Sequence, residues 1–125
     1  MSSHDPHRPL LAIPTQGAVP SFDHIYSLAA VGALLDQAIL VISLTEEILT
    51  AWRRRLQERV EPIAGLELVD GRFGWSTNWR AFFRSKRYDI VFLHGFHAAL
   101  RTQNIPPSYA QRLMAAASAG LIVLA

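Results

Sequence analysis

Two short apolar runs constrain the fold of this 125-residue chain more than any other feature. Residues 38–43 read AILVIS and residues 89–93 read DIVFL, so neither run alternates polar and apolar side chains as a half-exposed strand does. A nearly continuous apolar run is typical of a strand buried on both faces of a parallel sheet. Helix-like segments lie between the two runs and can supply the crossovers that parallel strands require. We therefore predict an α/β fold.

The rest of the chain continues this alternation of strands and helices. Further strands are predicted at residues 10–13, 66–69 and 121–124. Helices are predicted at 21–35, from Thr45 to the stop at Pro62, at 76–85 and at 107–119, with 98–104 as a loop or weak helix. Ser21, Thr45 and Ser76 are predicted to cap the first three helices, and Gly120 is predicted to end the last one. Together these elements predict a three-layer α/β domain over residues 10–125, with a five-stranded, mainly parallel sheet. Residues 1–9 are predicted to be a flexible tail.

The last predicted strand, 121–124, has no segment after it in the sequence that could cover it. We therefore expect an apolar sheet edge there, which binds a partner strand or helix or a second copy of the chain.

Composition narrows the function classes. The absence of cysteine excludes disulfides, cysteine-ligated zinc, iron–sulfur clusters and thiol catalysis. The net charge of +2 is too small to indicate nucleic acid as a partner. No apolar run reaches the ~18 residues of a membrane span, and residues 1–9 lack the apolar core of a secretory signal. We expect a cytoplasmic protein without a membrane span.

In open α/β sheets, ligands bind in the loops that follow the carboxyl ends of strands. The loop at residues 14–21 holds one glycine, two prolines and no lysine, whereas a phosphate-binding loop needs several glycines and a lysine. Thr15, Gly17 and Ser21 are therefore read as positions of a degenerate phosphate loop. We expect no cofactor and no ATP hydrolysis.

One resemblance spans most of the chain. Several segments resemble motifs of the RecA-like core of pilus and type II secretion ATPases: Pro14-Thr15, Gly74-Trp75-Ser76, Arg80, Arg84, Asp89–Leu93 and Ala116–Gly120. Val19 stands where that family has the phosphate-binding lysine, and His94-Gly95 stands where its Walker B strand ends in Gly-Glu. If the predicted strands are numbered along the sequence, the resemblance implies that they lie across the sheet in the order second, third, fourth, first, fifth. It also implies a pseudo-ATPase that regulates or scaffolds a bacterial assembly, such as secretion or pilus machinery, through protein contacts.

A second resemblance covers residues 38–125, which look like a response-regulator receiver that lacks its last strand and helix. Ser43-Leu44 stands at the position of the receiver's acidic pair, and His94 stands at the position of its phosphorylated aspartate. This alternative implies a pseudo-receiver that serves in signalling or dimerisation.

A third alternative is the N-terminal fragment of an α/β enzyme. Residues 92–96, FLHGF, are similar to the strand-end segment that helps build the oxyanion hole of α/β-hydrolases. The G-x-S-x-G nucleophile elbow that should follow it is missing from the sequence. His94 and His97 are assigned to the loop that follows the strand at 89–93 and are three residues apart. No carboxylate or third histidine lies near them in the sequence, so we expect no metal.

A basic cluster is the last candidate site. Arg80, Arg84 and Arg87 are four and three residues apart, which places them on one side of the helix predicted from Ser76. Packing of Trp79, Phe82 and Phe83 on the other side is expected to turn the arginines outward. They are either a solvated helix face or a site for an acidic protein surface or a phosphate-bearing ligand.

Overall fold

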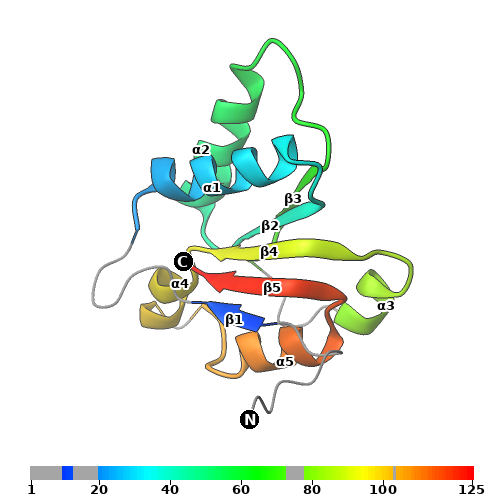
Figure 1. Ribbon diagram of the computed structural model, residues 1–125. Helices are drawn as coiled ribbons and strands as arrows, with labels where there is room; N and C mark the ends of the chain where they lie inside the picture. The colour runs from blue at the N-terminus through cyan, green and yellow to red at the C-terminus, as the bar shows by residue number, and fades with distance from the viewer. Residues whose placement is uncertain (1–9, 13–19, 73–77, 103) are drawn as a thin grey trace.

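The computed structural model describes residues 10–12, 20–72, 78–102 and 104–125 (Figure 1). The strands within this part are β1 (Leu10–Ala12), β2 (Ile39–Ser43), β3 (Leu66–Asp70), β4 (Tyr88–His94) and β5 (Ala119–Leu124). The helices are α1 (Phe22–Leu34), α2 (Glu46–Gln57), α3 (Trp79–Phe83), α4 (Phe96–Arg101) and α5 (Tyr109–Ala116). The tail predicted at 1–9 lies outside the described residues.

The five strands form one parallel sheet in the order β1-β5-β4-β2-β3. The predicted three-layer α/β fold is confirmed. Helices α1 and α2 cover one face of the sheet, and α3, α4 and α5 cover the other (Figure 1). The first face buries Trp52 and the second buries Phe83 and Leu113. No helix in the described part of the chain is long and apolar enough to cross a membrane.

The RecA-like strand order is wrong. That order places β2 at a sheet edge and β1 in the interior, whereas the structure places β1 at the edge and β2 between β3 and β4. The physical reason is burial. All five residues of β2 are buried, as an interior parallel strand requires, whereas β1 has only three residues, with Leu10 and Leu11 about half exposed. From β2 onward the order instead matches the flavodoxin-like order, and β1 takes the fifth place.

The expectation of an open edge at residues 121–124 is also wrong. β5 lies between β4 and β1, and Leu10 to Ala12 pair in register with Leu121 to Val123. The N-terminal strand returns to the position beside the C-terminal one, so the backbone groups of β5 already have partners on both sides.

Two helix starts confirm the sequence reading and one corrects it. The hydroxyls of Ser21 and Thr45 accept the backbone N–H of His24 and Ile48, each at 3.2 Å, and so cap α1 and α2. Helix α3 begins at Trp79 and is capped by Asn78, whose side-chain oxygen accepts the N–H of Ala81 at 3.3 Å. Ser76, the predicted cap, lies outside the described residues.

The bounds of α4 and α5 differ from the predicted helix bounds. The weak helix considered at 98–104 is α4, which begins at Phe96. The predicted helix 107–119 is shorter and covers Tyr109–Ala116, because Ala117 is extended and the chain then enters β5. Gly120, read as a helix stop, lies within that strand, where pairing with β4 outweighs the helical preference of the alanine run.

Candidate functional site

Three polar residues share one row at the carboxyl ends of adjacent strands. Ser43 of β2 pairs in register with Asp70 of β3 on one side and with His94 of β4 on the other. Because register partners in a parallel sheet point to the same face, all three side chains start on the face that carries α1 and α2. This is the end of an α/β sheet where ligands usually bind.

His94 is held inside the core of that face. Its side chain stacks on Phe22 with ring centroids 5.7 Å apart, and the indole N–H of Trp52 donates to His94 Nδ1 at 2.8 Å. Because Nδ1 accepts this bond, the neutral ring carries its proton on Nε2. Burial lowers the pKa of His94 from 6.5 to about 4, since a charged imidazolium would lose its hydration there. His94 is therefore neutral at physiological pH.

Asp70 and Ser43 do not combine with His94 into a hydrolytic triad. The Asp70 carboxylate binds the Arg72 guanidinium, with Nη2 to Oδ2 at 2.7 Å and Nε to Oδ1 at 3.0 Å, and this hydrogen bonding lowers the pKa of Asp70. The Ser43 hydroxyl is fully buried and has no hydrogen-bond partner among the described residues. A serine triad needs a histidine nitrogen free to accept the hydroxyl proton and a carboxylate on the other nitrogen, and neither contact is made.

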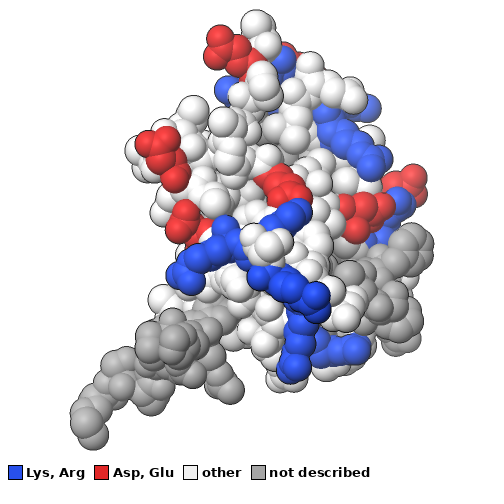
Figure 2. Space-filling model, turned by 90° about the vertical axis from the view of Figure 1, so that its right-hand side faces the viewer, with Lys and Arg blue, Asp and Glu red and all other residues white. Residues whose placement is uncertain are grey.

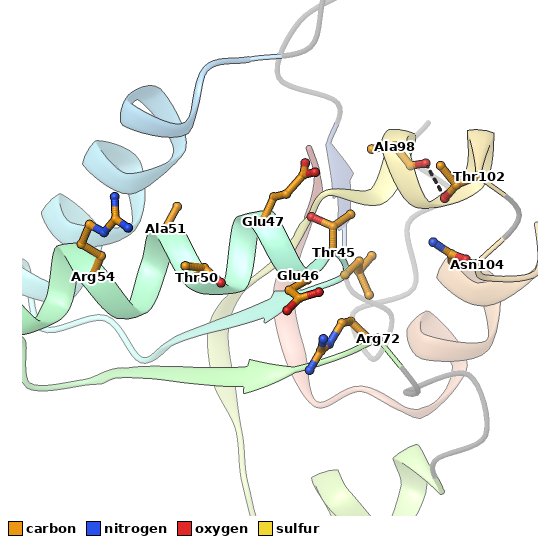
Figure 3. Close-up of a pocket in the computed structure, with 11 residues that line it drawn as sticks. Thr45, Glu46, Glu47, Thr50, Ala51, Arg54, Arg72, Ala98, Thr102 and Asn104 are labelled. Atoms are coloured by element: carbon orange, nitrogen blue, oxygen red, sulfur yellow. Dashed lines mark hydrogen bonds between the residues drawn. The ribbon is translucent and has the colours of Figure 1, made fainter.

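An open groove of about 1050 Å³ lies beside this row, along the outer side of α2 (Figure 3). Glu46 and Arg72 point toward one another across it, from α2 and from the segment after β3. Its lining combines carboxylates, guanidinium groups, hydroxyls and an amide: Leu44, Thr45, Glu46, Glu47, Thr50, Ala51, Arg54, Arg72, Ala98, Thr102 and Asn104. Charges of both signs in an open groove give it no preference for an anion or a cation.

The structure describes one of the three degenerate phosphate-loop positions. Thr15 and Gly17 lie outside the described residues, and the Ser21 hydroxyl is used as the cap of α1. The next residue, Phe22, stacks on His94, so the start of α1 closes over the carboxyl end of β4.

The strand-end loop predicted for His94 and His97 is wrong, because β4 extends through His94 and α4 begins at Phe96. His97 lies on α4, half-buried, with its ring 5.6 Å from that of Phe96. Across residues 10–12, 20–72, 78–102 and 104–125, no group of three or more histidine, aspartate or glutamate side chains is placed to hold a metal ion.

The predicted basic cluster lies at the opposite end of the sheet from the groove. Arg80 is on α3, Arg84 is its C-cap, and Arg87 directly precedes β4. All three side chains are exposed, whereas Trp79 and Phe83 are buried beneath them. Figure 2 views the molecule from the side on which α3 lies in Figure 1, and basic side chains gather on it around a few acidic ones.

The sequence reasoning missed a third surface, on the outer side of α1. Leu28, Val31, Leu34 and Leu35 are 43%, 54%, 68% and 70% exposed, and we call them the α1 stripe. The sequence shows the signal, since these residues are three and four positions apart and therefore lie on one side of the helix. A helix that is apolar on this side as well as on its buried side needs a second partner.

Comparison with protein families, with curated proteins and with solved structures found no match to this chain. The described part of the chain offers three candidate surfaces: the groove along α2, the basic cluster at α3 and the α1 stripe.

Proposed function

We propose that the chain is a non-catalytic interaction module of the pseudo-receiver type, which self-associates through the α1 stripe. The strand order of β2 to β5 supports the receiver-like alternative over the RecA-like one. The pseudo-ATPase hypothesis, with its link to secretion or pilus machinery, came from motif resemblance and implied a strand order that is not observed, so the strand order favours the pseudo-receiver.

The row at the carboxyl end supports the non-catalytic part of the proposal. His94 occupies the position that the resemblance assigns to the receiver's phosphorylated aspartate, and it is 3% exposed and bonded to Trp52. A side chain that receives a phosphoryl group must be reached by the donor and by a metal ion. The packing of Phe22 and Trp52 on His94 gives neither access.

The α1 stripe is the single observation that carries the proposal. Its four side chains line one side of a helix whose other side, with Ile25 and Ala29, is fully buried on the sheet. Exposed apolar patches of this kind mark contact surfaces.

A second copy fits the stripe for two reasons. The stripe carries no charge, so two identical stripes can meet about a two-fold axis without bringing like charges together. Two acids flank the stripe: Asp36, which is exposed, directly follows Leu35, and Asp23, in the first turn of α1, is already paired with Arg55 of α2. One helix pair buries less than the ~1,200 Å² of a standard interface, so we expect a weak dimer with a Kd in the micromolar to millimolar range.

Sedimentation velocity over a concentration series tests the proposal. The unmodified protein should shift from monomer to dimer as its concentration rises. Leu35→Glu places two carboxylates at the two-fold interface and should keep the protein monomeric over the same range. The matched control is Val60→Glu, which makes the same kind of change at a fully exposed apolar residue outside α1 and should leave the dimer intact.

Two results would reject the proposal. The first is an unmodified protein that stays monomeric up to about 1 mM, the weak limit expected for so small an interface. The second is a Leu35→Glu variant that dimerises as well as the Val60→Glu control.

A further inference from the structure

Several arginines of the described chain have no counter-charge, and three of them are grouped at α3. Arg55, Arg72 and Lys86 form ion pairs with Asp23, Asp70 and Glu67. Among the described residues, by contrast, the side chains of Arg80, Arg84 and Arg87 form no hydrogen bond or ion pair. We call these three residues the arginine face.

The arginine face stands on a rigid base. Trp79 and Phe83, on the buried side of α3, are 7% and 2% exposed. The Trp79 ring meets Phe82 and Tyr109 edge to face, with centroid separations of 5.7 and 6.1 Å. This packing fixes the backbone that carries Arg80 and Arg84, so less conformational entropy is lost when a ligand binds them.

Charge complementarity identifies the ligand as anionic, and guanidinium chemistry favours carboxylates or phosphates held by two parallel hydrogen bonds. The surroundings favour carboxylates on a polypeptide. The Glu67 carboxylate, which is paired with Lys86 between Arg84 and Arg87, adds an acid beside the arginine face that a continuous phosphate backbone would have to pass. Three arginines are also fewer than the basic contacts with which proteins typically hold nucleic acid.

We infer that the arginine face binds an acidic segment of a partner protein. Carboxylates spaced along a peptide can reach Arg80, Arg84 and Arg87 one by one. The inference is independent of the dimer proposed through α1, because it uses another element on another side of the fold.

Fluorescence anisotropy with a fluorescein-labelled peptide of alternating glutamate and alanine tests the inference at low salt. The unmodified protein should bind the peptide. Arg80→Ala, Arg84→Ala and Arg87→Ala combined should weaken binding about tenfold, because several exposed contacts of modest strength are lost together. Raising the salt concentration should weaken the unmodified protein toward the level of the triple variant.

A matched control removes the same charge elsewhere. Arg53→Ala, Arg54→Ala and Arg101→Ala combined take away three exposed arginines from α2 and α4, and this variant should bind the peptide within about twofold of the unmodified protein. Leu35→Glu should also bind normally, which separates this test from that of the dimer.

Three results would overturn the inference: no binding of the peptide, an equal loss in both triple variants, or tighter binding of a single-stranded oligonucleotide of the same charge. The last result would assign the arginine face to nucleic acid.

Discussion

Protonating His94 in the folded protein is costly, because its ring is enclosed by Phe22 and Trp52. The same enclosure explains why a histidine at a strand end, where catalytic groups are common, serves packing here. The indole N–H of Trp52 finds its acceptor on His94, so each side chain satisfies the other in the core.

This burial makes stability depend on pH. Burial lowers the pKa of His94 in the folded protein to about 4, against 6.5 when exposed. Between these values the unfolded chain binds a proton that the folded protein does not, so the free energy of unfolding falls as the pH is lowered from 6.5 to 4. The pKa shift corresponds to about 3 kcal/mol of the free energy of unfolding. This stability is fully present above pH 6.5 and is lost by the time the pH falls below 4.

Urea unfolding at several pH values measures the effect. His94→Asn removes the titrating group but keeps an oxygen at the place of Nδ1 that can accept the Trp52 hydrogen bond. Its unfolding free energy should vary less between pH 6.5 and 4, and the remaining variation belongs to the carboxylates. Equal pH dependence in both proteins would mean that His94 is not protected from protonation.

At the scale of elements, α2 depends on its cap. The Thr45 hydroxyl accepts the N–H of Ile48, and the N-terminal turn that it closes forms one wall of the groove. Thr45→Ala should lower the free energy of unfolding by about 1 kcal/mol, measured by urea titration. Thr45→Ser keeps the hydroxyl and should retain most of the stability. If the serine variant loses as much as the alanine variant, the lost methyl group rather than the cap explains the change.

Element starts were predictable where one side chain decides them. Ser21 and Thr45 are short hydroxyl residues, each followed by an acid in the first turn, and both caps are as predicted. The ends of α5 were not predictable, because the alanines at 115–117 favour a helix locally while Gly120 and its neighbours pair with β4. Pairing between distant strands decides such a boundary, and no local pattern contains it.

At the scale of the whole molecule, the sequence predicts the layers but not the strand order. Apolar runs at β2 and β4 identify buried strands, and both are interior. Their apolar patterns do not say which neighbour each strand has. The same holds for the candidate sites. The exposure of Arg80 could be predicted from helical spacing, whereas the Trp52–His94 contact could not, because it joins residues 42 positions apart.

The position of β1 gives the last prediction. Its backbone pairs with β5 and takes the place of the open edge that the sequence suggested. Deleting residues 1–12 should expose the β5 backbone beside Ile122 and Val123, lower the free energy of unfolding by about 1–3 kcal/mol, and promote aggregation. Deleting residues 1–9 retains β1 and is the matched control. Thermal unfolding and light scattering, at a concentration where the unmodified protein is monomeric, measure both effects. If the two truncated proteins are equally stable and equally soluble, β1 does not protect the edge, and β5 tolerates exposure because α-helices already cover both of its faces.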